Sequence, residues 1–80
     1  MLEELKSKNK LVGFKQSLKA VEGGLVKKAF LAREAQDKVR IPVEQSCAQG
    51  GIEIEYVDTL KELGAACDIN IGAAVAVLLK

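Results

Sequence analysis

The sequence predicts a single α/β domain, a three-layer α/β/α sandwich in which helices cover both faces of a small mixed sheet. The 80 residues suffice for one domain, and we expect residues 1–80 to form it. Apolar residues recur with a helical period in some segments and with a strand period in others. Two short runs, 29–32 and 74–79, are apolar throughout, which is typical of strands covered on both faces.

The first half of the chain alternates between short extended and helical segments. We expect a short helix over 2–7, an extended segment over 10–13 and a helix over 14–22. At about 100° per residue, Phe14, Leu18, Val21 and Leu25 fall within one narrow stripe. Gly23 and Gly24 are expected to end this helix, since glycine readily adopts the left-handed conformation.

The second half continues the alternation. After the strand at 29–32 we expect a loop over 33–37 and a helix over 39–49, in which Pro42 restricts where the regular turn begins. Gly50 and Gly51 end it, and a strand follows over 52–57. Thr59 and Glu62 have capping-box spacing, so a helix is expected to run to about residue 67. A loop over 68–72 leads to a central strand at 74–79.

Composition argues against catalysis and metal binding. The chain contains no His, the commonest general base and metal ligand. Cys47 and Cys67 have no C-x-x-C spacing, and we expect two buried small hydrophobic residues, a disulfide or a reactive thiol being the alternative. Glu53 and Glu55 are predicted to share a solvated strand face. We therefore expect a protein that is not an enzyme and has neither a cofactor nor a metal.

Charge is distributed unevenly along the chain. The net charge is +1, but residues 1–28 hold seven Lys against three Glu, whereas residues 29–80 hold five basic and eight acidic residues. Such a chain can present a basic face to a polyanion, although a solvated lysine-rich surface is the alternative. No apolar run reaches the roughly 18 residues of a membrane span, and the acidic start does not resemble a signal peptide. We expect a cytoplasmic protein with no membrane contact.

The segment from Gly13 to Lys19 is the first candidate for binding. A glycine at a helix start leaves backbone N–H groups open to an anion, and Lys15 and Lys19 add charge one turn apart. Gln16 adds both a donor and an acceptor, which reading a base edge requires. An ordinary amphipathic helix with a glycine cap explains the same spacing.

The second candidate is Ile69-Asn70-Ile71, because two isoleucines in a short loop are unusual. An exposed apolar tip often marks a contact surface. The alternative is that both isoleucines turn inward and fill the end of the sandwich.

Four segments together resemble the kink-turn RNA-binding ribosomal protein family, of the large-subunit protein 7Ae type, and its compact bacterial members above all. Gly13-x-Lys15-Gln16-x-x-Lys19 is similar to the family's Gly-x-(Asn/Lys)-(Glu/Gln)-x-x-Lys signature. The other three follow in order and cover nearly the whole chain: Phe30-Leu31-Ala32-Arg33-Glu34-Ala35, Leu60-Lys61-Glu62-Leu63-Gly64 and Ile69-Asn70-Ile71-Gly72-Ala73-Ala74.

This resemblance implies a non-catalytic protein that recognises and stabilises kink-turns, which are bent RNA duplexes with a bulge beside tandem sheared G·A pairs. In the family, the Gly-to-Lys segment enters the widened major groove and the apolar loop covers nucleotides turned out of the helix. The implied RNA-binding residues are Gly13, Phe14, Lys15, Gln16, Lys19, Arg33, Glu34, Ile69, Asn70 and Ile71. The implied partner is RNA, such as ribosomal RNA or a structured mRNA leader, with no DNA, and the protein is expected to be a monomer that is associated with the ribosome.

Two departures from the family pattern bear on selectivity. Lys15-Gln16 stands where many members have Asn-Glu, which trades a carboxylate acceptor for an amide and adds a charge. Asp68 stands where the family commonly has Gly, which bears on the backbone geometry of the apolar loop.

Two other functions remain as alternatives. A protein-interaction module would use the apolar loop at 69–71 to bind a partner protein. A small redox or accessory domain would use Cys47 or Cys67. Neither alternative explains the basic helix at 14–22.

Overall fold

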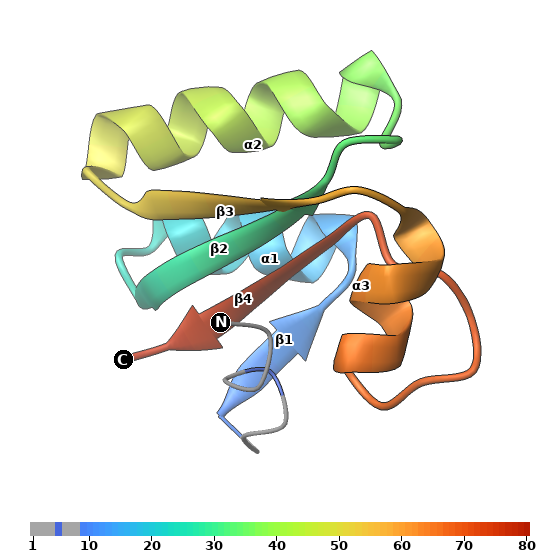
Figure 1. The fold of residues 1–80 in the computed structure, drawn as a ribbon. Coiled ribbons are helices and arrows are strands. Elements are labelled where there is room, and N and C mark those ends of the chain that lie inside the picture. Colours follow the sequence, from blue (N-terminus) through green and yellow to red (C-terminus); the bar gives the residue numbers. More distant parts are fainter. Residues whose placement is uncertain (1–4, 6–8) are drawn as a thin grey trace.

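The computed structural model describes Leu5 and residues 9–80, and it has the predicted three layers (Figure 1). In chain order the elements are β1 (Lys10–Val12), α1 (Phe14–Glu22), β2 (Val26–Ala32), α2 (Asp37–Gly50), β3 (Glu53–Val57), α3 (Leu60–Ala66) and β4 (Val75–Leu79). The helix expected over 2–7 lies outside the described residues, apart from Leu5.

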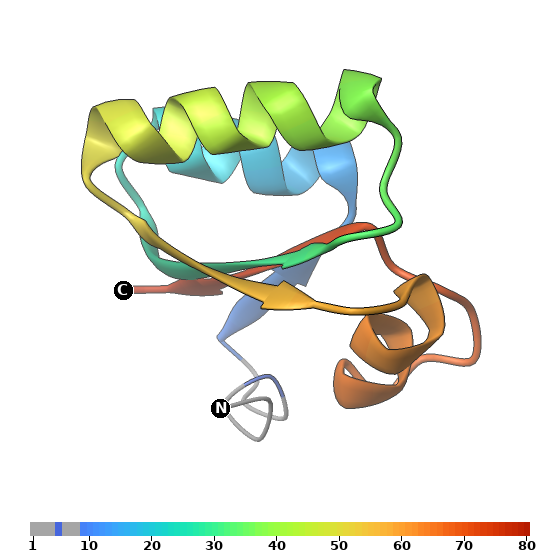
Figure 2. The same ribbon diagram turned by 45° about the horizontal axis from the view of Figure 1, so that its top comes forward.

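The four strands form one mixed sheet in the order β1-β4-β2-β3. β4 pairs antiparallel with both β1 and β2, and β2 pairs parallel with β3. The last strand of the chain is therefore central, as its apolar sequence predicts. Figure 2 shows α1 and α2 together on one face of the sheet and α3 on the other.

Each face of the sheet packs against its own hydrophobic core. Between the sheet and α1 and α2 lie alternate residues of β2 and β4, among them Leu31 and Val77, together with Val43 of α2. The other face buries Phe30 against Leu63 of α3. Because side chains alternate along a strand, β2 and β4 supply both cores, which is why they are apolar at every central position.

The cysteines are buried, one in each core. Cys47 of α2 belongs to the α1 and α2 side, and Cys67 at the end of α3 belongs to the other side. Both are free thiols. The expectation of two small buried residues is confirmed.

The chain around Leu25 differs from the sequence prediction. Leu25 was placed on the apolar stripe of the first helix, but α1 ends at Glu22 and Gly24 takes a positive φ of 74°. The reversal carries Leu25 off the helix, and the residue is 59% exposed. The strand then starts at Val26, three residues earlier than expected, with a register shift between Val26 and Lys28.

The second helix is longer than predicted. It begins at Asp37 rather than at residue 39 and includes Pro42. A proline in the second turn removes only one backbone hydrogen bond near the helix start, and tertiary packing of Val43 and Cys47 offsets that loss. The helix ends at the predicted glycine pair, and Gly51 takes the left-handed conformation.

No helix in the described part of the chain is both long and apolar enough to cross a membrane.

Candidate nucleic-acid interface

The start of α1, the β2–α2 loop and the start of β4 lie at one end of the sheet, where β2 and β3 finish (Figure 1). The 69–71 loop leads into β4 from the side of the sheet that α3 covers, opposite to α1. The N–H of Gly13 donates to the Val75 carbonyl at 3.0 Å, which fixes the start of α1 beside the start of β4. The N–H of Ala32 donates to the Ala74 carbonyl at 2.8 Å, which brings the β2–α2 loop to the same place. Two backbone bonds thus gather segments that are far apart in sequence.

Gly13 has a backbone that only glycine adopts easily. Its φ is 114° and its ψ is 154°, and a Cβ built on it would have no heavy atom within 4 Å. The glycine is therefore required by conformation rather than by crowding within the protein. No protein atom fills the space where a Gly13 side chain would stand, so another molecule can approach the backbone closely at the start of α1.

Lys15, Gln16 and Lys19 all lie exposed on the outer face of α1, whereas Phe14 is partly buried. Phe14 packs against the core between α1, α2 and the sheet. Of the four, the first three are therefore placed to contact a ligand, and Phe14 is placed to hold the helix on the sheet.

An apolar hollow lies beside two of these residues. Its volume is about 450 Å³, and Gln16 and Lys19 line it together with Leu11, Ala20, Gly23 and Leu25. The exposed Leu25 forms part of its wall. The outer face of α1 therefore offers apolar surface next to its polar groups.

Glu34 holds α3 in place. One carboxylate oxygen, Oε1, accepts a hydrogen bond from the N–H of Leu60 at 2.8 Å, and Thr59 Oγ1 accepts from the N–H of Glu62 at 3.0 Å. Together these side chains satisfy two of the unpaired donors at the start of α3. The threonine cap confirms half of the capping box expected from the sequence.

Arg33 lies next to Glu34 and is exposed. Its Nε is 3.2 Å from Asp58 Oδ1, and its guanidinium lies over the ring of Tyr56 at 5.3 Å from the ring centre. Both pairs join the β2–α2 loop to the end of β3.

The apolar loop packs very closely on α3 through two glycines. A Cβ on Gly64 would lie 2.0 Å from the Ile71 carbonyl oxygen, and one on Gly72 would lie 3.0 Å from Leu60 Cβ. The N–H of Ala73 also donates to the Leu60 carbonyl at 3.0 Å. The loop is therefore positioned by α3, which Glu34 positions in turn.

The two isoleucines of the loop have different environments. Ile69 is partly buried and packs against the core beneath α3, whereas Ile71 is 74% exposed. Asn70 is exposed between them. The sequence left open whether the isoleucines form an exposed tip or turn inward. Ile69 turns inward and Ile71 forms an exposed apolar tip.

Sequence reasoning missed the structural roles of three residues in this region. Gly64 was noted only as part of a motif, yet it determines how closely the loop approaches α3. Tyr56 was read as an ordinary strand residue, but it lies beneath Arg33. Glu34 was expected at the RNA, and its carboxylate caps α3. A glycine within a predicted helix is the one signal that the sequence offered for such a close approach.

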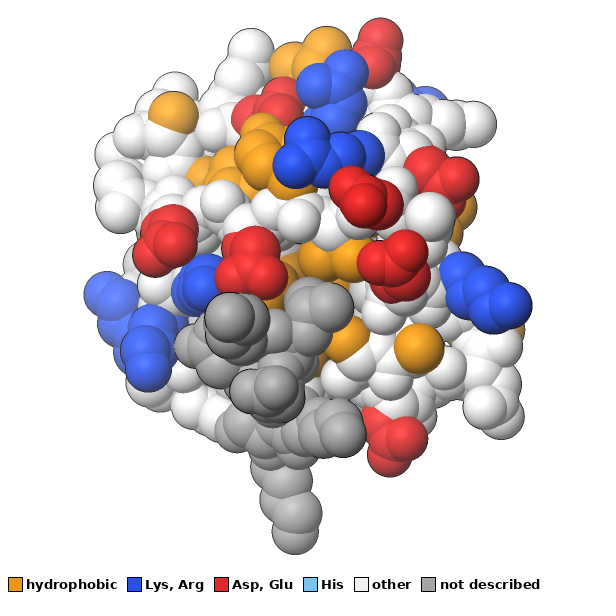
Figure 3. Space-filling view, in the orientation of Figure 1, with side chains coloured by type: hydrophobic (Ala, Val, Ile, Leu, Met, Phe, Trp, Pro, Cys, Tyr) orange, Lys and Arg blue, Asp and Glu red, His pale blue; other side chains and the backbone are white. Residues whose placement is uncertain are grey.

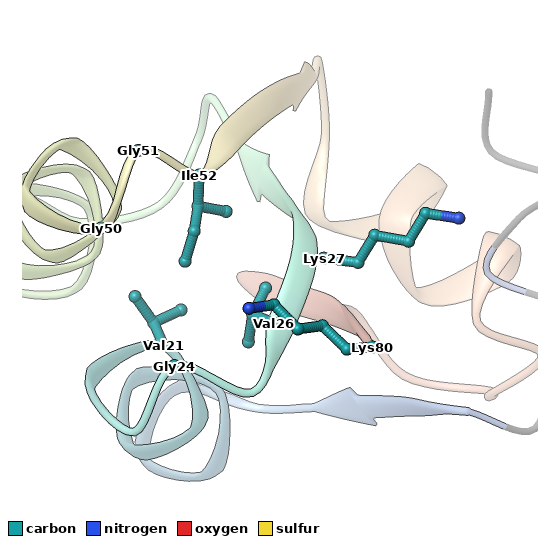
Figure 4. A pocket seen from close by; sticks show the side chains of 8 residues that line it. All are labelled: Val21, Gly24, Val26, Lys27, Gly50, Gly51, Ile52 and Lys80. Carbon is teal, nitrogen blue, oxygen red and sulfur yellow. The ribbon is translucent and has the colours of Figure 1, made fainter.

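A second pocket lies at the opposite end of the sheet and has different chemistry (Figure 4). Its volume is about 300 Å³, and Val21, Gly24, Val26, Lys27, Gly50, Gly51, Ile52 and Lys80 line it. The C-terminal ends of α1 and α2 are both there, and helix C-termini disfavour anions. Lys80 extends over the apolar floor in Figure 4, while Lys27 points away.

The acidic residues of β3 form ion pairs. Lys28 Nζ is 2.9 Å from Glu55 Oε1 and 4.0 Å from Glu53 Oε2. The hydrogen bond from Lys28 lowers the pKa of Glu55. The bond therefore favours the ionised form of Glu55, which suits an ion pair better than proton transfer. Within residues 9–80 and Leu5, no three potential metal ligands come together.

Sequence comparison places the chain among proteins named for RNA binding. A model of the "Ribosomal protein L7Ae/L30e/S12e/Gadd45 family" matches residues 2–80. An RNA-binding protein of Caldanaerobacter subterraneus is 43% identical over 67 residues, covering 84% of this chain and 82% of that protein. One of Halalkalibacterium halodurans is 41% identical over 70 residues, 88% of this chain and 85% of the other.

Structural comparison agrees on the fold. The solved structure of the Giardia lamblia 15.5kD RNA binding protein matches with a TM-score of 0.85 and 24% identity, covering 99% of this chain and 70% of that one. The match over 79 of the 80 residues and the relatives above 40% identity lead to one conclusion. The chain belongs to the ribosomal protein L7Ae/L30e/S12e/Gadd45 family.

Proposed function

We propose that this protein binds RNA at the end of the sheet where α1 and β4 begin, and that the RNA it recognises is a kink-turn. One observation carries the proposal: the Gly13–Val75 hydrogen bond brings the open start of α1 to the end of the sheet at which the loop with the exposed Ile71 joins β4. The names of the bacterial relatives support RNA as the ligand.

The chemistry of this surface suits distorted RNA better than a regular duplex. The major groove of A-form RNA is too narrow for side chains, so the exposed amide of Gln16 reaches base edges only where the groove is widened. Lys15 and Lys19 contact phosphates, which position the complex without reading its sequence. Ile71 supplies an apolar surface for a nucleotide that has left the stack.

The remaining residues of the predicted set divide by their contacts. Arg33 and Asn70 are exposed and join the binding surface. Phe14, Glu34 and Ile69 act by positioning, because their side chains pack in the core or cap α3. We propose that the protein acts without catalysis, as a monomer that stabilises bent RNA, including RNA of the ribosome.

Binding to matched RNAs tests the proposal. Titration by calorimetry or gel shift compares a kink-turn with the same RNA whose G·A pairs are replaced by Watson–Crick pairs. We expect the kink-turn to bind at least about tenfold more tightly, since several contacts depend on its geometry. Equal affinity for the two RNAs would overturn the kink-turn assignment.

A matched pair of variants tests the surface. Gln16→Ala is expected to reduce discrimination between these RNAs, whereas Lys27→Ala is not, because Lys27 lies at the other end of the sheet. Similar losses in the two variants would remove Gln16 from the interface.

Protein–protein interaction is the second candidate, favoured by the exposed apolar side chains of Leu25 and Ile71. It predicts association that persists after nuclease treatment and in high salt. Ile71→Ser would weaken such association while leaving RNA affinity unchanged, which is the reverse of the expectation for the RNA surface.

A further inference from the structure

A polar hollow beside the proposed RNA surface contains both arginines of the chain. It has a volume of about 400 Å³, and Arg33, Ala35, Asp37, Arg40, Glu44 and Tyr56 line it. Its walls come from the β2–α2 loop, the first half of α2 and the end of β3. In Figure 3, hydrophobic, basic and acidic side chains adjoin one another in the region between α2 and β3.

The hollow contains a preformed stack of a cation on an aromatic ring. The guanidinium of Arg33 lies 5.3 Å from the centre of the Tyr56 ring. The Arg33 side chain is 63% exposed and Tyr56 is 37% exposed, so both planar groups are accessible to a ligand. Aromatic rings and guanidinium planes are the surfaces on which proteins stack unpaired RNA bases.

Hydrogen bonds fix the ring from the side of α2. The hydroxyl of Tyr56 donates to Glu44 Oε2, and Arg40 Nη1 lies 3.4 Å from Glu44 Oε1. Arg40 Nη2 also bonds to Asp37 Oδ1 at 2.6 Å. The bond to Glu44 raises the pKa of Tyr56, so the phenol remains neutral at physiological pH. The ring is therefore held in one orientation before any ligand arrives.

The charge balance of the cluster indicates which part of a nucleotide it accepts. Its two arginines, Arg33 and Arg40, face three carboxylates, those of Asp37, Glu44 and Asp58. A phosphate would meet a net negative environment there. A nucleobase carries no charge, and its amino groups donate to carboxylates such as the exposed Asp37.

We propose that Arg33, already part of the proposed RNA surface, forms with Tyr56 a further contact that binds one unpaired nucleobase at the edge of that surface. The inference rests on the proposed function, because the same RNA must already be held at the start of α1. It extends the interface across the β2–α2 loop to the edge strand β3. The base lies against the exposed part of the ring and guanidinium, and the carboxylates accept from its edge.

The protein provides a specific reporter for this contact. Tyr56 is the single tyrosine and the chain has no tryptophan, so intrinsic emission on excitation near 280 nm comes from this ring. A kink-turn RNA with an unpaired nucleotide flanking the bend is titrated while anisotropy of a labelled RNA end follows binding. We expect Tyr56 emission to fall with the same midpoint as the anisotropy change, after correction for RNA absorbance with free N-acetyltyrosinamide.

Two variants of the ring separate stacking from structure. Tyr56→Ala removes the stacking surface and is expected to weaken binding by about five- to tenfold, at the lower end of the range for base stacking because the ring is only partly exposed. Tyr56→Phe keeps the ring and is expected to bind within about twofold of the wild type. Neither change should alter the dependence of affinity on salt, whereas Lys19→Ala should lower that slope by about one.

The outcomes distinguish this inference from the proposed function. RNA binding with unchanged Tyr56 emission would overturn the stack and leave the kink-turn surface intact. So would equal affinity of Tyr56→Ala and wild type. An unaltered anisotropy signal for every kink-turn RNA would overturn the proposed function and, with it, this contact. If Tyr56→Ala fails to fold, the change in Tyr56 emission of the wild-type protein on RNA binding still tests the contact.

Discussion

Asp68 has a left-handed backbone conformation, which residues other than glycine seldom adopt. Its φ is 63°, and within the described residues every other positive φ belongs to a glycine. Asp tolerates the left-handed region better than most residues but still costs more than glycine there. Asp68 therefore carries backbone strain in this loop.

Replacing Asp68 by glycine should therefore stabilise the protein. Asp68→Gly is expected to raise the free energy of unfolding by about 1 kcal/mol, because the left-handed conformation no longer carries a Cβ penalty. Urea unfolding followed by circular dichroism measures this change. RNA affinity should also rise modestly, since a negative charge beside the loop is lost. A less stable variant would show that the Asp68 side chain makes a compensating contact.

At the scale of elements, the short helix α3 depends on side chains from outside it. Glu34 accepts from the N–H of Leu60 and Thr59 accepts from the N–H of Glu62. A helix of seven residues has little stability of its own. Its position therefore depends on the β2–α2 loop, and the apolar loop depends on α3.

Removing the Glu34 cap tests this dependence. Glu34→Ala should cost about 1 kcal/mol of stability, comparable to the loss of an N-cap. Glu34→Gln retains an acceptor oxygen and is the matched control. We expect Glu34→Ala to accelerate hydrogen exchange in α3 and in the loop at 69–71 while β2 and β4 remain protected. Uniform acceleration across the sheet would contradict a local role.

Gly64 offers a test of the contact between α3 and the apolar loop. Gly64→Ala places a Cβ against the Ile71 carbonyl, so backbone must move and about 1–3 kcal/mol of stability is expected to be lost. RNA affinity should fall as well, because the tip at Ile71 shifts. Gly50→Ala is the control, since a Cβ there would meet only the Ile52 side chain at 3.4 Å. Equal RNA affinity of Gly64→Ala and Gly50→Ala would mean that the position of the 69–71 loop does not affect RNA binding.

The elements show how far sequence reasoning reaches. The helix at 14–22 and its end at Gly23 were predictable because a helical period ends at a glycine pair. The start of β2 was not, because Lys27 and Lys28 lack strand character and lie at a register shift that only pairing with β4 creates. The candidate binding segments could be named from their motifs, whereas the roles of Glu34 and Gly64 depend on contacts between layers that no local pattern reveals.

For the whole molecule, the ion pair between Lys28 and Glu55 makes the stability of the fold depend on pH. The Lys28 side chain is 15% exposed, lies 5.2 Å from the centre of the Phe30 ring and bonds to Glu55. The folded-state pKa of Glu55 is lowered by that bond, so the folded protein binds fewer protons than the unfolded chain in acid. The stabilisation from this pair is complete above the unfolded pKa and is lost as pH falls through the folded value.

Glu55→Gln removes the charge through which Glu55 contributes to stability. At pH 7 the variant should be less stable than wild type by up to about 1 kcal/mol, which is typical of a partly exposed pair. As pH falls below the lowered folded-state pKa of Glu55, the two proteins should become equally stable, since the carboxylate is then protonated in both states. Urea denaturation at pH 7 and in acid gives the comparison. A constant difference would mean that Glu55 acts through packing rather than charge.

The two buried thiols can report separately on local opening at the two faces of the sheet. Burial raises the pKa of Cys47 and of Cys67, so both sulfurs react slowly with an alkylating reagent until their surroundings open. One sulfur lies under α2 and the other at the end of α3, on opposite faces of the sheet. The alkylation rate at each cysteine therefore measures how often its side of the protein opens. A partner bound at the exposed Ile71 would slow alkylation of Cys67 more than that of Cys47.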